Sequence, residues 1–209
     1  MIRCLWEAEV GSTMWKMQRA GSDIDLVRFY ATSTRQLLDG RITMSNSHES
    51  HGTEGETPFD AVSHEVGKLV HEYLRGNVNF VWAVWSPIVR ISSPEMVKFR
   101  RIVAKDMSKN VVSSCIGLAT SAVRDGERHP ERTMKRNFQA VRTLRFARAW
   151  LRGRGPVFEP AMFYESLEKE FEAARRAFDE SVLPSRMNEK PLRDWLFEIR
   201  MRELIGVDA

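Results

Sequence analysis

VGSTMWKMQRAGSDIDL, residues 10–26, is the most informative run in this 209-residue chain. A Gly-Ser pair follows a first apolar segment, and an Asp-x-Asp pattern formed by Asp23 and Asp25 follows about ten residues later. The β-branched and aromatic side chains of residues 24–31 predict a strand. Because residues two apart on a strand point to the same face, we expect the two carboxylates to lie side by side.

Two neighbouring carboxylates repel each other, and a divalent cation relieves that repulsion. Oxygen ligands of this kind suit Mg²⁺ or Mn²⁺. Gly11 would let the backbone approach a phosphate closely, and Ser12 would donate hydrogen bonds to the phosphate oxygens. The run therefore indicates a site for a metal ion and a phosphate group.

The remaining sequence indicates an N-terminal part that mixes strands and helices. Residues 4–10 alternate apolar and acidic positions, which favours a strand-like segment. Residues 46–57, NSHESHGTEGET, are polar, so we expect a mobile surface loop with weak electron density. Residues 58–63 resume an extended pattern, and residues 63–75 have apolar side chains at helical spacing before a glycine C-cap.

Beyond a short helix at residues 79–86, a Ser-Ser-Pro-Glu helix start at residues 92–95 begins a part that reads as helical nearly to its end. The predicted helices are 95–106, 108–124, 131–152, 160–181 and 189–205. The fold class is therefore α+β, with an N-terminal domain at residues 1–90 followed by an all-helical domain at residues 91–209.

Charge is distributed unevenly within a net charge of +4. Residues 128–154 hold nine basic side chains and one acid, Glu131. Such density attracts polyanions such as nucleoside triphosphates or nucleic acid, although a solvated helix face has the same composition.

Cysteine usage and hydropathy exclude several other classes of protein. Cys4 and Cys115 form no disulfide framework or zinc motif, and we expect both to be reduced, buried thiols. No run approaches the roughly 18–20 apolar residues of a membrane-spanning helix, and no cleavable leader is visible. We therefore expect no membrane partner and a cytoplasmic location.

The Gly-Ser turn and the Asp-x-Asp pattern together resemble the nucleotidyltransferase superfamily of DNA polymerase beta-like folds. Within that superfamily the chain looks like the predicted-nucleotidyltransferase branch associated with RNA-repair genes, and the resemblance covers most of the sequence. The further matching positions are Asp60, Glu65, Lys68-Leu69, Gly76-Asn77, Ser86-Pro87, Gly117-Leu118-Ala119 and the Lys135–Arg145 helix. The resemblance implies that the N-terminal domain is a nucleotidyltransferase domain, with a small mixed β-sheet flanked by helices.

The resemblance also implies a two-metal site completed by a third carboxylate, at Asp60. Asp23 and Asp25 would hold both ions, and Asp60 would hold the catalytic ion and activate the attacking hydroxyl. The expected reaction moves a nucleoside monophosphate from an NTP, with ATP favoured, to a hydroxyl on nucleic acid, protein or a small molecule. A different assignment is that Asp60 caps the 63–75 helix and Glu65 is the third acid.

A basic helix supplies the candidate phosphate contacts. Lys135, Arg142 and Arg145 are spaced to share one helix face, and we hypothesise that this face borders the cleft and meets the triphosphate or an RNA-like polyanion. The chain departs from the resembled branch at Trp15-Lys16, where a small residue or glycine is usual, and at Trp82, which replaces a glutamate. The alternative function is a non-catalytic nucleotide sensor or antitoxin-like binding module on the same fold.

Overall fold

The computed structural model describes residues 2–19, 21–161 and 163–205. Contacts divide the chain into two compact units. The first unit holds the described residues of 1–74, 82–106 and 188–209, and the second holds 75–81 and the described residues of 107–187. That residues 1–90 and 91–209 form two separate domains stays a prediction.

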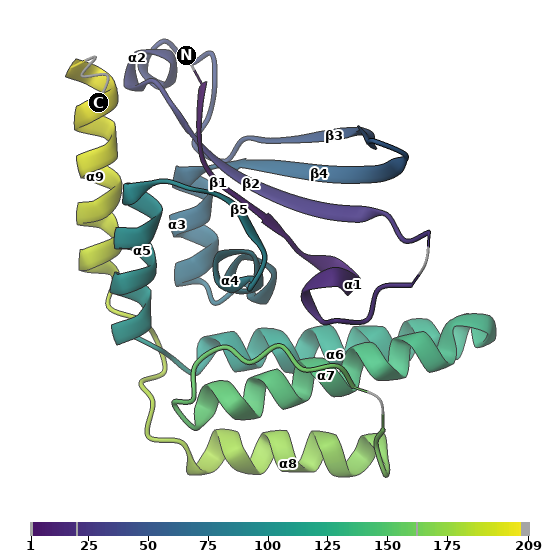
Figure 1. Ribbon diagram of the computed structural model, residues 1–209. Helices are drawn as coiled ribbons and strands as arrows, with labels where there is room; N and C mark the ends of the chain where they lie inside the picture. Colours follow the sequence, from purple (N-terminus) through teal and green to yellow (C-terminus); the bar gives the residue numbers. More distant parts are fainter. Residues whose placement is uncertain (1, 20, 162, 206–209) are drawn as a thin grey trace. The chain divides into compact units, whose positions relative to one another are not determined.

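A five-stranded mixed sheet forms the centre of the first unit, with the strand order β3-β4-β2-β1-β5 (Figure 1). The parallel pair is β2 with β4, and the other neighbours pair antiparallel. The strands are β1 (Ile2–Glu9), β2 (Ile24–Thr32), β3 (Ser47–Glu54), β4 (Thr57–Glu65) and β5 (Val89–Ser92). This sheet and the helices around it confirm the α+β class.

The core of the first unit lies between the sheet and helices that pack on it. Trp6 of β1 and Phe29 of β2 are fully buried, as are Leu69 and Tyr73 of α3. Their burial follows from the apolar spacing of α3 at i and i+4, which directs one helix face to the sheet. The helices with described residues in this unit are α1 (Gly11–Met14), α2 (Thr34–Leu38), α3 (Val66–Leu74), α5 (Pro94–Lys105) and α9 (Glu189–Ile205), while α4 (Val78–Trp85) contains residues of both units.

The polar run at residues 46–57 is a β-strand over most of its length, so the prediction of a mobile loop was wrong. β3 pairs with β4 from Ser47–His64 to Glu54–Thr57. Every residue of β3 is exposed, so the strand shows no apolar alternation from which to recognise it. Arg90 binds the end of this hairpin, because its guanidinium donates to Glu54 at 2.7 Å and to Glu9 at 2.8 Å.

Several smaller predictions also need correction. Residues 63–65 continue β4, so the helix predicted from residue 63 starts at Val66. The helix predicted at residues 160–181 starts only at Leu167, where Ser166 caps it by accepting a hydrogen bond from the Lys169 amide at 3.1 Å. Cys4 is exposed rather than buried, whereas Cys115 is buried as expected.

The second unit is a layer of packed helices. Its elements are α6 (Asn110–Arg128), a 3₁₀ turn η1 (Pro130–Arg132), α7 (Thr133–Leu151) and α8 (Leu167–Glu180). Ala119, Ala140, Leu144 and Ala174 form a fully buried cluster between α6, α7 and α8. Small alanine side chains let the helix backbones approach closely, and leucine fills the remaining space. Across the described parts of both units, no helix combines the length and the apolar character needed to cross a membrane.

Candidate functional site

Two acidic residues of the candidate site lie on neighbouring parallel strands. Asp25 of β2 and Asp60 of β4 are register partners, so their α-carbons lie on neighbouring strands about 4.8 Å apart and their side chains leave the same face. His51 of β3 is the partner of Asp60 on its other side. Asp25, Asp60 and His51 therefore form one row across three strands, although 35 residues separate the two aspartates in sequence.

The Gly-Ser turn lies directly against Asp25. The Val10 amide donates to the Asp25 carbonyl at 2.8 Å, which holds the start of α1 beside β2. Gly11 has a φ of +61°, and a Cβ built on it would lie 1.8 Å from Asp25 Oδ2. Only glycine fits this position, because a side chain would overlap the carboxylate and would strain the left-handed backbone. Ser12 follows in α1 and is half-buried.

Asp60 lies well inside β4, and it contacts a histidine that the sequence analysis did not include. Its Oδ1 is 2.5 Å from His51 Nδ1, and this hydrogen bond with the nearby Asp60 charge raises the pKa of His51. The side chains of Asp60 and His51 remain 54% and 71% exposed, so both are open to ligands. Because α3 starts six residues later, Asp60 is not the cap of that helix.

Glu65, the other candidate for the third acid, has a different set of partners. Its side chain is fully buried and accepts two hydrogen bonds of 2.7 Å from Arg200 Nη2. The Gly67 amide also donates to it at 2.5 Å, and the Thr32 amide donates at 3.4 Å. A carboxylate enclosed by four such contacts is engaged in holding α9 against β4, which favours Asp60 as the third acid.

The donor chemistry at this end of the sheet fits a hard divalent cation, since Asp23, Asp25 and Asp60 offer only carboxylate oxygens. Asp23 is exposed, just before β2 begins. The side chains are not gathered, however. Asp25 is directed at Gly11 and Asp60 at His51, and among residues 2–19, 21–161 and 163–205 no three His, Cys, Asp or Glu side chains are close enough to hold one ion.

The three basic residues predicted to meet phosphate differ in their surroundings within the second unit. Lys135 is exposed on α7. Burial lowers the pKa of Arg142 to about 10. Arg145 donates to Glu170 at 2.9 Å and to the Phe163 carbonyl at 2.6 Å, so its guanidinium links α7 to the α8 side of the unit. Contact of these residues with a nucleotide stays a prediction.

The two departures from the resembled branch are connected in the structure. Trp15 and Trp82 are buried and meet edge to face, with ring centroids 5.3 Å apart and planes at 87°. Lys16, next in sequence, has a φ of +55°. This left-handed conformation favours glycine, and Lys16 adopts it with a side chain. The Trp15–Trp82 contact fills space beside the Gly-Ser turn with apolar surface.

The sheet is mixed, the Gly-Ser turn lies against Asp25 of β2, and β2 pairs with β4, which carries Asp60. This arrangement is typical of polymerase beta-like nucleotidyltransferases. Residues 1–191 match the model of the RlaP family, described as the RNA repair pathway DNA polymerase beta family. The chain belongs to this family. No curated protein matches the chain. The family match ends within the first turn of α9, so Arg200 lies beyond it.

Proposed function

We propose that this chain is a metal-dependent nucleotidyltransferase that moves a nucleoside monophosphate from an NTP to a hydroxyl acceptor and releases pyrophosphate. One observation supports it above the others. Within a member of a polymerase beta family, the register of β2 and β4 pairs Asp25 with Asp60, and Asp25 is seated on the glycine of the Gly-Ser turn. Asp23, Asp25 and Asp60 offer carboxylate oxygens, which are the ligands that Mg²⁺ and Mn²⁺ prefer.

Each acidic residue has a separate role in this proposal. Asp23 and Asp25 would hold both Mg²⁺ or Mn²⁺ ions, and Asp60 would hold the one beside the attacking hydroxyl. When bound, the ions supply charge stabilisation for the attacking and departing oxygens. Asp60 would first exchange its contact with His51 for this role, and the exposure of both side chains leaves room for that change.

The acceptor oxygen forms a bond to the α-phosphorus of the NTP, its proton passes to the carboxylate of Asp60, and the bond between the α-phosphorus and the bridging oxygen breaks. The bridging oxygen leaves with pyrophosphate. Gly11 and Ser12 would hold the phosphate chain in line through backbone and hydroxyl donors.

ATP is the proposed donor. RNA or another polyanion is the proposed acceptor, because the second unit carries an excess of cationic side chains. Lys135, Arg142 and Arg145 are the proposed phosphate contacts. Of the three, Lys135 is the one whose removal tests phosphate binding most simply, since it is exposed and its loss leaves the interior of the unit unchanged.

The deciding experiment incubates the protein with each α-labelled NTP, Mg²⁺ or Mn²⁺, and a mixture of RNA and cell lysate, and follows labelled product and pyrophosphate. Asp25→Asn and Asp60→Asn should each lower transfer by about a hundredfold or more, because removing even an outer partner of a metal ligand typically costs about 10–100-fold. Asp39→Asn is the matched control, because Asp39 is an exposed aspartate at the end of α2.

Transfer that persists in Asp25→Asn and Asp60→Asn would refute the mechanism. If the protein binds NTP with Mn²⁺ but produces no pyrophosphate with any acceptor, the chain is a nucleotide sensor instead. Folding of each variant is checked by circular dichroism, so that a loss of transfer is not confused with a loss of structure.

A further inference from the structure

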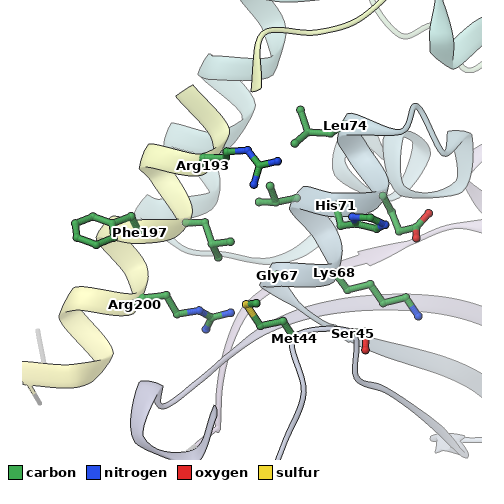
Figure 2. A pocket seen from close by; sticks show the side chains of 12 residues that line it. Met44, Ser45, Gly67, Lys68, His71, Leu74, Arg193, Phe197 and Arg200 are labelled. Atoms are coloured by element: carbon green, nitrogen blue, oxygen red, sulfur yellow. The ribbon is translucent and has the colours of Figure 1, made fainter. Parts of the chain in front are cut away.

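A groove between α3 and α9 lies in the first unit, away from the aspartates. Its volume is about 920 Å³, and residues of α3 and α9 form its two sides while Met44 and Ser45 close one end (Figure 2). Small-molecule sites usually measure about 300–1,000 Å³. Asp60 lies five residues before Glu65 on β4, roughly 17 Å away along an extended strand.

The walls of the groove are largely apolar. Val70 and Leu74 contribute from α3, and Leu196 and Phe197 contribute from α9. Val70 is 4% exposed, so the floor belongs to the folded core, whereas Phe197 is 65% exposed and Met44 is 55% exposed. A contiguous apolar surface, and not a single exposed side chain, marks a binding site, and here the apolar side chains line one groove.

Cationic side chains line the same groove. Arg193 and Arg200 reach from α9 toward α3 in Figure 2, and Lys68 contributes from α3. The charge of Arg200 is offset by Glu65. Lys68 donates to Ser47 Oγ at 2.7 Å and, among the residues that the structure describes, forms no ion pair.

Arg193 can also change partners at small cost. Its pair with Glu189 at 2.6 Å is an exposed contact between successive turns of α9, and such pairs contribute only about 0.3–0.5 kcal/mol. Lys68 and Arg193 are therefore two cations at the edges of a groove whose lining also includes one acid, Glu72, and each is available to an anionic group.

From this arrangement we propose that the groove binds a small amphipathic anion, with an aliphatic or aromatic body and one carboxylate, sulfonate or phosphate group. The body lies against Val70, Leu74 and Leu196, and the anionic group is held by Lys68 or Arg193. This site is independent of the proposed nucleotidyl transfer, because it uses none of the residues assigned to that reaction.

The test uses two fluorescent probes that differ in one group. 8-Anilinonaphthalene-1-sulfonate carries the sulfonate, and N-phenyl-1-naphthylamine has the same ring system without it. We expect saturable binding of the sulfonate probe at one site per native chain, with a lower affinity for the neutral probe. Equal affinity for the two probes, or sulfonate binding that does not saturate at one site, overturns the proposal.

Substitutions then locate the site. Lys68→Gln and Arg193→Gln change exposed or half-exposed side chains, and at least one of them should weaken the sulfonate probe by about fivefold without affecting the neutral probe. Leu196→Arg should weaken both probes. Lys190→Gln is the matched control, because Lys190 is an exposed cation on α9 with its own pair to Asp194, outside the groove.

The two glutamine variants keep the test decisive even if Leu196→Arg fails to fold. The proposal is wrong if Lys68→Gln and Arg193→Gln both bind the sulfonate probe as tightly as Lys190→Gln does. It is also wrong if the neutral probe loses as much affinity as the sulfonate probe in those two variants, because the cations would then act only on the shape of the groove.

Discussion

The buried pair between Glu65 and Arg200 is an interaction whose loss should lower the stability of the first unit strongly. Arg200 Nη2 donates to both oxygens of Glu65 at 2.7 Å, and its Nη1 donates to the Thr32 carbonyl at 3.3 Å. The Arg200 side chain is 12% exposed and that of Glu65 is fully buried. Arg200→Ala removes the cation and leaves the carboxylate in an apolar interior.

The magnitude follows from this geometry. Removing one partner of a buried ion pair costs about 3–5 kcal/mol, because the remaining charge is uncompensated. The Gly67 and Thr32 amides still donate to Glu65, which favours the lower part of that range. Since domains are typically stable by about 5–15 kcal/mol, a loss of about 3 kcal/mol is readily measured.

Urea unfolding followed by tryptophan fluorescence is the appropriate assay, because Trp195 lies buried on the same helix as Arg200. Lys190→Ala is the control, since its exposed pair with Asp194 should contribute under about 0.5 kcal/mol. Replacing the pair together, as Glu65→Leu with Arg200→Met, should recover much of the loss. A loss below about 1 kcal/mol for Arg200→Ala would refute the assignment of a buried, energetically coupled pair.

Three further outcomes are expected. Gly11→Ala should lower stability by roughly 1–2 kcal/mol or more, through left-handed strain and overlap with Asp25, whereas Gly117→Ala, in a helix with open space around it, should be neutral or stabilising; urea midpoints compare the two. Lys16→Gly should raise stability by up to about 1 kcal/mol in the same assay, against the usual penalty for glycine, because Lys16 has a φ of +55°. Burial lowers the pKa of His64 from its ordinary 6.5 to about 4, so the unfolded chain binds the extra proton between those values and stability should fall as pH drops through that window. His64→Gln should reduce this loss of stability at low pH. Urea unfolding at pH 7 and pH 5 measures the loss, and an equal loss in the original protein and in His64→Gln would contradict the reasoning.

The Gly-Ser turn and the strand that follows it were predictable from sequence because their signal is local. Asp23, Asp25 and the Gly-Ser pair fall within 17 residues, and the β-branched run after them marks β2. The apolar spacing of α3 and the proline start of α5 are equally local, and the structure confirms both helices with shifts at their ends. Short-range patterns of this kind reflect which side chains one element buries.

What the sequence did not indicate depends on pairing between distant or exposed segments. β3 is exposed on both faces, so only its hydrogen bonds to β4 define it, and the contact of His51 with Asp60 depends on that register. The partner of Glu65 lies 135 residues away, on a helix whose pattern does not distinguish Arg200 from its other arginines. No periodicity encodes such contacts, because they depend on how elements meet.

Strand β4 carries both Asp60, which the sequence indicates, and Glu65, whose contact with Arg200 the sequence does not indicate. Asp60 must stay opposite Asp25 for the proposed chemistry, and a slip of one residue along the strand would turn Asp60 to the other face of the sheet. The side-chain contacts of Asp60 are exposed and give little resistance to such a slip. Glu65, five residues later, resists it strongly, because Arg200, Thr32 and Gly67 all fix its carboxylate in the interior. The register of the candidate site is therefore held from the opposite end of its own strand, by a helix whose arginine lies outside the family match.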